Sequence, residues 1–290
     1  MSKIKASKSN DDKAKAAANK KATFGDDIDL NKYTSSGEER PYQNDPSQLP
    51  PQTKERMLSA GVMLDDPGQR SGTYLQMDNT PIHSSIRQEG VEVMALSQAL
   101  EKYGWLGDYL WKAVAVDSDK YTANVELNEN DGYFIRALPG QKTVFPIQAC
   151  LYMAQAKLVQ NVHNIVIAEE GSELHIITGC ATASREEPGL HIGVSEFYIK
   201  RGAKVTFTMI HNWNPAIAVR PRTTTIVEEG GLFLSNYLLM KPVSSLQMYP
   251  TARCTGENAT VRYNSIMIAA KGTNIDVGSR VFLNAKKTRT

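Results

Sequence analysis

Apolar residues in the first 130 positions recur at the spacing of a helix. Leu96, Leu100 and Tyr103 follow one another at intervals of three and four, which predicts an amphipathic helix within residues 93–111. A shorter helix is expected over residues 53–60, directly before a glycine. The sequence therefore predicts a small helical region in the first half of the chain.

From about Tyr133 the helical periodicity disappears. Short runs rich in Val, Ile, Thr, Phe and Tyr follow one another, separated by turn residues, and none of the connections has the pattern of a long helix. This succession predicts a mainly β fold. The expected strands are 145–151, 164–168, 174–178, 192–199, 204–211, 223–227, 232–240, 245–249, 259–268 and 274–283.

The turns between these runs share one design, which is two residues, most of them charged, followed by a glycine and a small residue. A glycine at that place allows the positive φ of a tight turn. Gly140, Gly171, Gly202 and Gly230 are 31, 31 and 28 residues apart, and a period of this length is typical of stacked repeats. Strands without helices at this period favour a β-solenoid, with a β-sandwich as the alternative. The four clearest turns are 169–172, 200–203, 228–231 and 270–273.

Composition narrows the class of protein. The 33 Lys and Arg against 31 Asp and Glu leave a net charge of +2, which offers no overall reason to expect a nucleic-acid partner. No apolar run approaches the roughly 18 residues of a membrane span. Three cysteines are too few for a disulfide framework and, being odd in number, indicate reduced thiols and a cytoplasmic location.

The chain divides into three expected parts. Residues 1–52 are a disordered leader that is basic at its start and proline-containing later, and their first 21 positions carry seven lysines but no apolar segment of a signal peptide. A weak Ala-rich helix or a nucleic-acid-binding arm is the alternative there. Residues 53–132 form the helical region, and residues 133–290 form the β core.

Strand parity selects candidate interior residues, because alternate residues of a strand share a face. Val205, Phe207 and Met209 form one apolar face, and His211 and Trp213 continue the same parity. The plain interpretation is a core histidine bonded to backbone beside a packed tryptophan. The functional interpretation is an imidazole and an indole that point into the interior near a strand end.

Cys180 shares the inward parity of Ile176. A buried cysteine is usually a small inert core residue. Cys180, however, lies at a strand end, next to Gly179 and before a loop that contains Arg185, where a nearby cation could make its thiolate reactive or metal-binding. Both interpretations stay open at this stage.

The other two cysteines are less distinctive. Cys254 follows Arg253 at a strand-to-turn position, and Cys150 lies within an apolar run that indicates a structural role. No C-x-x-C spacing occurs, so any metal site must be assembled across coils or across subunits. The sequence also lacks a phosphate-binding G-x-x-x-x-G-K-[ST] loop, an H-E-x-x-H motif and a G-x-S-x-G motif.

Several long segments of the β region are distinctive enough to compare with a known family. They are GSELHIITGCATA (171–183), HIGVSEFYIKRGAKVTFTMIHNW (191–213), VRPRTTTIVEEGG (219–231), SLQMYPTARCTGENA (245–259) and VGSRVFLNA (277–285). These segments closely resemble the core of the SufB/SufD family of iron–sulfur cluster assembly scaffold proteins. The helical segment EKYGWLGDYLWKAV (101–114) is similar to the short, archaeal-type members. The resemblance covers roughly residues 80–290 and leaves residues 1–50 uncovered.

The resemblance implies a right-handed parallel β-helix that serves as a cytosolic scaffold, without enzymatic turnover of its own. An iron–sulfur cluster is assembled on it transiently, and a reduced flavin in the full complex is a further cofactor to consider. Its implied partners are a SufC-like ABC ATPase, a second scaffold subunit in a homodimer or a SufB–SufD-type heterodimer, and a cysteine desulfurase or other sulfur donor. No membrane or nucleic-acid partner is expected.

The resemblance also implies roles for individual residues. Cys180 matches the family cysteine of a strand-end Gly-Cys-Ala motif that accepts sulfur. His211 and Trp213 occupy a Gln/His-Asn-Trp motif associated with an internal sulfur path, and Arg222 falls near a basic position of the next strand. Cys254, where the family pattern does not match, could substitute as a second metal ligand beside Cys180.

Family members normally continue past the equivalent of Thr290 with further coils and a helical region that docks the ATPase. We therefore expect the β-helix core to be incomplete at its C-terminal end and the docking region to be missing. One alternative is a SufD-like structural partner that supports the dimer and the ATPase without carrying a persulfide. Another is an unrelated β-helix that binds carbohydrate, which requires an exposed row of aromatics that the sequence does not show.

Overall fold

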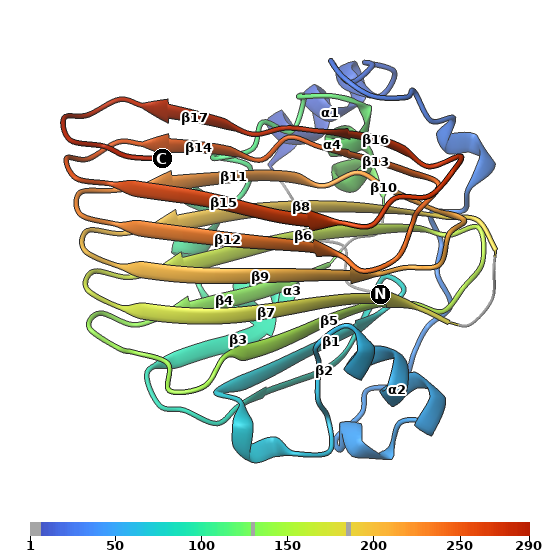
Figure 1. Ribbon diagram of the computed structural model, residues 1–290, viewed down its shortest axis with the longest axis horizontal. Coiled ribbons are helices and arrows are strands. Elements are labelled where there is room, and N and C mark those ends of the chain that lie inside the picture. The colour runs from blue at the N-terminus through green and yellow to red at the C-terminus, as the bar shows by residue number, and fades with distance from the viewer. Residues whose placement is uncertain (1–6, 129–130, 184–186) are drawn as a thin grey trace.

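The computed structural model describes residues 7–128, 131–183 and 187–290. Its body is a parallel β-solenoid of about five turns, and its few helices belong to the N-terminal part of the chain (Figure 1). Strands account for 42% of the protein and helices for 17%. The predicted mainly β, parallel β-helix fold is confirmed.

Two sheets form the walls of the solenoid. The first has the strand order β15-β12-β9-β7-β5-β1-β2, with β1 and β2 antiparallel and the others parallel. Its strands are β1 (Gly72–Met77), β2 (Thr80–Ile86), β5 (Ile147–Met153), β7 (Glu173–Thr182), β9 (Lys204–Asn212), β12 (Leu232–Leu239) and β15 (Thr260–Met267).

The second sheet is centred on β8, which pairs with β6 on one side and with both β10 and β11 on the other. The later rungs of this sheet are likewise split into two short strands each. Its members are β3 (Val91–Ala95), β4 (Tyr133–Ala137), β6 (Val159–Ala168), β8 (Gly189–Ile199), β10 (Ile217–Val219), β11 (Arg222–Val227), β13 (Ser245–Met248), β14 (Thr251–Cys254), β16 (Asn274–Val277) and β17 (Arg280–Leu283).

The register between neighbouring rungs follows the period expected from the turn glycines. Glu173 pairs with Lys204, and Lys204 pairs with Leu232, so the offsets are 31 and 28 residues. The corner glycines have positive φ, for example +66° at Gly202. At the corner between β14 and β15 the positive φ belongs to Asn258. The repeat inferred from the turns is therefore the coil of the solenoid.

The main core lies between the two sheets. Phe197 of β8 meets Phe207 of β9, with ring centroids 4.8 Å apart, and also meets Phe233 of β12. All three rings belong to one continuous buried cluster. Burial of such alternating apolar residues supplies the main free energy that holds the coils together.

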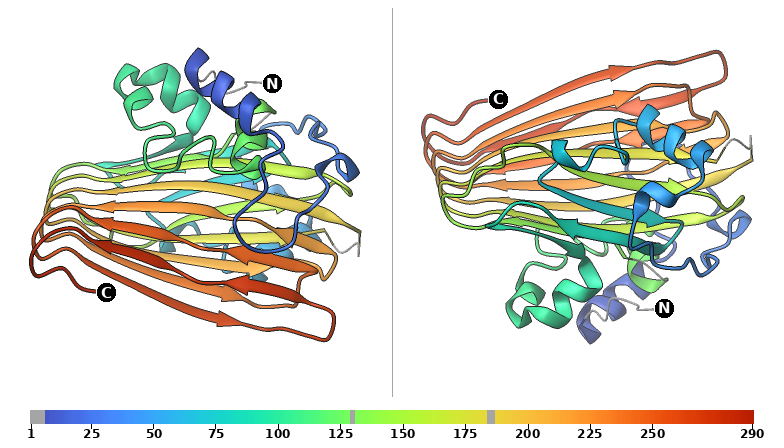
Figure 2. Two further views of the ribbon diagram at one scale, coloured as in Figure 1. Left: turned by 90° about the horizontal axis from the view of Figure 1, so that it is seen from above. Right: turned by 90° about the horizontal axis from the view of Figure 1, so that it is seen from below.

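A second core forms where the helical region covers the outer face of the β8 sheet. The elements that cover it are α1 (Lys8–Ala17), α3 (Leu96–Lys102), the 3-10 helix η4 (Gly104–Asp108) and α4 (Lys120–Leu127), and Figure 2 shows them gathered on one side of the solenoid. Ile192 and Val194, which alternate with the inward residues of β8, belong to this cluster. Strand β8 is therefore buried on both of its faces over its whole length.

Glu196 of β8 anchors the helical region to the solenoid. This fully buried carboxylate accepts hydrogen bonds from the backbone N–H groups of Trp111 (2.7 Å), Ala113 (2.6 Å) and Val114 (3.0 Å). Its Oε1 also lies 2.8 Å from Nε2 of His163. A buried carboxylate is tolerated only with such partners, so the network specifies how the segment after η4 docks.

The N-terminal part contains more regular structure than the sequence predicts. The helix expected over residues 53–60 is α2 (Pro51–Ser59). Its Met57 packs against the outer face of the sheet that contains β1 and β5. The helix expected from residue 93 begins only at Leu96, because the preceding residues form β3 and pair with β4. Strands β1 and β2 also fall inside the expected helical region.

The leader is ordered over residues 8–17, where α1 buries Ala14 and Ala17 against the second core. Ser7 caps this helix by accepting a hydrogen bond from the backbone N–H of Asn10. The Ala-rich helix, rather than the disordered tail, is thus the alternative that applies here, because tertiary burial stabilises a helix that would be marginal alone.

Candidate functional site

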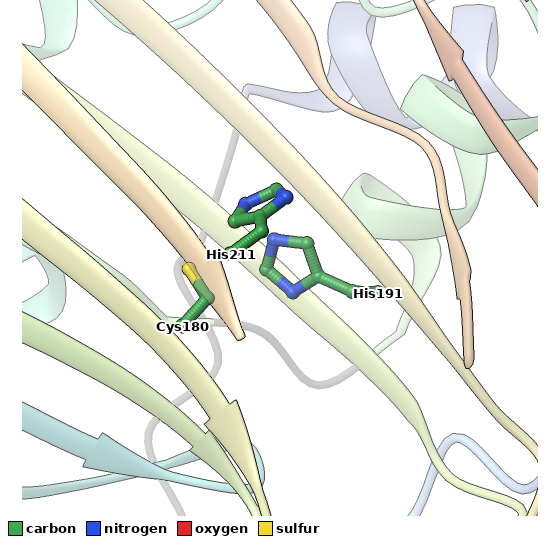
Figure 3. Close-up of side chains that lie close together, drawn as sticks. All are labelled: Cys180, His191 and His211. Carbon is green, nitrogen blue, oxygen red and sulfur yellow. The ribbon is translucent and has the colours of Figure 1, made fainter. Parts of the chain in front are cut away.

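Cys180, His191 and His211 converge inside the solenoid (Figure 3). One ligand atom from each, the Cys180 Sγ and a ring nitrogen of each histidine, lies within 4.8 Å of the other two. All three residues are almost completely buried. The described residues therefore contain a compact interior centre of one thiol and two imidazoles.

Strand pairing positions the three side chains. Cys180 near the end of β7 is the register partner of His211 near the end of β9, so their side chains project from neighbouring strands into the same interior. His191 lies at the start of β8 in the opposite sheet. Residues far apart in sequence meet because the two sheets face each other.

His191 was not among the residues that we predicted from the sequence. Its signal is present in the alternation of β8, where Phe197 and Ile199 face the inner core and His191 has the same parity. Its distance from Cys180 and His211, however, depends on how the two sheets pack, which strand alternation does not encode.

Hydrogen bonds hold both imidazoles by the same ring atom. Nδ1 of His191 lies 2.9 Å from Oε1 of Gln160, and the amide nitrogen of Gln160 donates to the backbone carbonyls of Asp78 and Tyr152. The Gln160 oxygen must therefore accept, so His191 carries its proton on Nδ1. Nδ1 of His211 lies 2.9 Å from the Tyr237 hydroxyl. This partner is a side chain, not the backbone group of the plain interpretation.

In both rings Nε2 is the nitrogen that these hydrogen bonds do not use. Nε2 of His211 is buried and has no hydrogen-bond partner among the described residues. At Gly193, an added Cβ would lie only 2.9 Å from Nε2 of His191, so the glycine keeps a side chain away from that nitrogen. An unpartnered buried nitrogen is costly and calls for an explanation.

Trp213 closes the centre on one side. Its ring centroid lies 5.1 Å from that of His191 and 5.6 Å from that of His211, and the indole is fully buried. The structure thus places Trp213 beside both histidines of the centre. The indole excludes water from the two imidazoles.

Burial determines the protonation of the centre. It raises the pKa of the Cys180 thiol well above its usual range, lowers the pKa of His191 to about 3, and lowers the pKa of His211 well below its usual value, with a smaller effect of His191 on His211. At neutral pH the resting centre is a protonated thiol beside two neutral imidazoles. Arg185, the cation that the sequence offers for a Cys180 thiolate, lies outside the described residues.

A pocket of about 290 Å³ opens beside the centre, between the later coils. Tyr237, which contacts His211 through its hydroxyl, lines this pocket, as do Met209, Met248 and Met267. The pocket therefore extends from the partner of His211 along the interior and is lined by soft thioether groups.

Arg222 does not join this centre. It pairs with Val194, which faces the outer core, and so points outward. Its Nε donates to Oδ2 of Asp119 at 2.7 Å, and its guanidinium lies over the Tyr121 ring. Arg222 holds α4 against the sheet, and its expected place on a sulfur path has no counterpart in these contacts.

Cys254 faces the interior but lies at the other end of the coil. It pairs with Val227, which pairs with Ile199, eight residues along β8 from His191. At a rise of about 3.3 Å per residue, that places Cys254 roughly 26 Å from the centre. The structure does not bring Cys180 and Cys254 together as ligands of one metal. Cys150 lies on the outer face of its sheet, in the hydrophobic cluster that also contains Met57 of α2.

The fold and the centre define a β-solenoid protein whose interior carries a thiol, two imidazoles and an indole at one end of its coils. Comparison with known proteins then identifies the family. The profile of the family "SUF system FeS cluster assembly, SufBD core domain" matches residues 151–290. Together with the relatives below, this match shows that the chain belongs to the SufBD family of iron–sulfur cluster assembly proteins.

Three relatives illustrate the range of similarity. An iron–sulfur cluster assembly SufBD family protein of Methanothermobacter thermautotrophicus is 48% identical over 280 residues, which cover 94% of this chain and 68% of the relative. A SufBD family protein of Archaeoglobus fulgidus is 50% identical over 236 residues, 81% of this chain and 63% of the relative. The cluster assembly protein SufB of Bacillus subtilis is 23% identical over 252 residues, 83% of this chain and 53% of the relative.

Among the described residues, none of the helices has the length and apolar character needed to cross a membrane.

Proposed function

We propose that this protein is a scaffold subunit on which iron–sulfur clusters are assembled, and that Cys180 accepts the sulfur. Membership in the SufBD family supports the assembly role. The observation that carries the residue assignment is the convergence of the Cys180 thiol with two neutral histidines inside the solenoid. A water-poor interior suits a persulfide, which is reactive and easily lost.

The two imidazoles supply the base that a buried thiol requires. Once the solenoid opens and water reaches the centre, a neutral ring nitrogen takes the Cys180 proton, and the resulting thiolate attacks the outer sulfur of a persulfide on a donor protein. A new S–S bond forms at Cys180 while the donor's S–S bond breaks, and the donor cysteine leaves as a thiolate. Trp213 excludes water, and the methionine-lined pocket offers the transferred sulfur an interior path from the centre.

The scaffold works with partners in this proposal. A cysteine desulfurase or another sulfur donor supplies the persulfide, and a SufC-like ABC ATPase drives the opening of the solenoid that a fully buried Cys180 needs. The solenoid pairs with a second subunit as a homodimer or a SufB–SufD-type heterodimer, in the cytoplasm. Family membership supports these roles, and the chain itself contributes no P-loop sequence for ATP hydrolysis.

The test combines the protein anaerobically with a cysteine desulfurase, cysteine, ferrous iron, a SufC-like ATPase and ATP. The expected results are a mass increase of one sulfur on the peptide containing Cys180 and the visible absorption of an iron–sulfur cluster. The Cys180→Ala variant is expected to lose both the added sulfur and the cluster absorption. The Cys150→Ala variant, which alters a cysteine on the outer face of its sheet, is expected to retain both. Unchanged cluster formation in the Cys180→Ala variant would overturn the assignment.

The second candidate is a SufD-like structural subunit that binds the ATPase and the partner subunit without carrying a persulfide. The complete burial of Cys180 and the raised pKa of its thiol favour this candidate. It predicts that no persulfide appears on Cys180 under the conditions above, although the protein still forms a complex with the ATPase.

A further inference from the structure

We propose that Cys180, His191 and His211 form a mononuclear metal site for a divalent transition-metal ion, with one ligand position left open. This inference deepens the proposed function, on which the choice of iron as the natural ion and of a sulfur anion as the fourth ligand rests. The site itself is argued from the geometry of the three side chains.

The ligand atoms have nearly the spacing that a metal requires. A tetrahedral ion with one sulfur ligand at ~2.3 Å and nitrogen ligands at ~2.0–2.1 Å holds its ligand atoms roughly 3.3–3.7 Å apart. The three ligand atoms lie within 4.8 Å of one another, so side-chain movements of about 1 Å would close the site. They come from three strands of two facing sheets, which is a rigid support.

The second coordination sphere is already in place. Metal-bound histidines usually donate their other ring N–H to a fixed acceptor, which orients the ring and selects its tautomer. His191 donates from Nδ1 to Gln160, and Nδ1 of His211 is held by Tyr237. The Nε2 of His211 is buried without a partner among the described residues, and a metal ion would satisfy it.

The donor set selects the ion. One thiolate and two imidazoles suit ions of borderline softness such as Fe²⁺, Co²⁺ and Zn²⁺, and disfavour Mg²⁺ and Ca²⁺, which prefer oxygen. Binding replaces the thiol proton of Cys180 by the metal and releases that proton to solvent. Both imidazoles are neutral before binding, so neither has to lose a proton.

The charge balance indicates what occupies the open position. A divalent ion and one thiolate leave a net charge of +1 in an interior where an uncompensated charge is costly. An anionic fourth ligand neutralises this charge, and in cluster assembly a sulfide or persulfide sulfur has the required chemistry. The pocket lined by Met209 and Tyr237 provides space from which such a ligand enters.

Anaerobic titration of the metal-free protein with Co²⁺ tests the site, because cobalt bound to thiolate has a characteristic charge-transfer absorption. We expect one equivalent to bind with this band and with the intense d–d bands of tetrahedral Co²⁺. X-ray absorption of the same sample, which requires no variant, should show one sulfur and two nitrogen ligands. Addition of azide, as a probe of the open position, should shift the d–d bands.

Matched variants locate the ion. Cys180→Ser should abolish the charge-transfer band, and His191→Gln or His211→Gln should weaken Co²⁺ binding at least tenfold. Cys254→Ser, which alters a buried interior cysteine at the far end of the coil, should bind Co²⁺ like the unaltered protein. Circular dichroism verifies that each variant is folded.

The absence of a sulfur–cobalt band in the folded, unaltered protein would overturn the inference, as would a band that depends on Cys254 or d–d bands that azide leaves unchanged. The readout is independent of cluster assembly. Cobalt binding without persulfide or cluster formation would overturn the proposed function and leave the metal site standing. Persulfide and cluster formation without cobalt binding would overturn the metal site and leave the proposed function standing.

Discussion

Cys180 of β7 and His211 of β9 are direct register partners, which places a thiol and an imidazole side by side on the inner wall of the solenoid. The coil period of 31 residues between these strands decides this pairing, since a shift of one residue would turn one of the two side chains to the outer face. The chemistry of the centre therefore depends on the lengths of the corners as much as on the residues themselves.

The burial of the cysteines predicts that they resist alkylation in the native protein. Cys150, Cys180 and Cys254 are fully buried, and burial raises the pKa of each thiol. With iodoacetamide at neutral pH, we expect each to react roughly 100-fold or more slowly than in the urea-unfolded chain, because reaction requires opening of the structure. Mass spectrometry of the digested protein measures the rate at each cysteine. Rapid native labelling of Cys180 would contradict the buried centre.

Replacing Glu196 by glutamine should destabilise the protein strongly. The amide cannot accept from the backbone donors of Trp111 and Ala113 as the carboxylate does, and it places a new donor toward them. We expect a loss of about 2–4 kcal/mol in the free energy of unfolding, measured by urea denaturation. The control is Glu170→Gln, which removes an exposed ion pair with Arg201 and should cost less than about 1 kcal/mol. Similar losses in the two variants would show that Glu196 is not the anchor.

The corner glycines should matter for their backbone conformation and not for space. Gly202 has φ of +66° with no atom within 4 Å of an added Cβ, so Gly202→Ala should cost about 1–2 kcal/mol through strain alone. Gly104 is equally uncrowded but lies outside the left-handed region, so Gly104→Ala should be neutral or slightly stabilising. Thermal or urea unfolding of the pair distinguishes the two effects, and an equal response would refute the role of the positive φ.

Arg222 should contribute to stability and not to sulfur or metal chemistry. Its side chain and that of Asp119 are only 11% and 7% exposed, and their atoms lie 2.7 Å apart. A double-mutant cycle with Arg222→Ala and Asp119→Ala should give a coupling of about 1–3 kcal/mol in the free energy of unfolding. Asp119 also caps the N-terminus of α4. The double-mutant cycle cancels the effect of losing this cap, because the Asp119→Ala change is present on both sides of the comparison. Loss of the cobalt band in a folded Arg222→Ala variant would contradict this placement.

Strand alternation allowed much of the centre to be predicted. The apolar face that ends in His211 and Trp213, and the parity that Cys180 shares with Ile176, follow from the two-residue period of a strand. The same rule, applied to β11, places Arg222 on the outer face of the sheet. Val227 faces the inner core, and a residue five positions earlier must face outward. That signal was available in the sequence.

The sequence by itself determined the repeat, the mainly β class and the inward faces of the strands, because each depends on local spacing and turn chemistry. The tertiary structure alone decided that His191 completes the centre, that Cys254 lies far from it, and that α1 and β1–β3 are ordered. These features depend on which sheets face each other and which surfaces need cover. Contacts of that kind join strands of facing sheets or segments outside the repeat, and no local period along the chain encodes them.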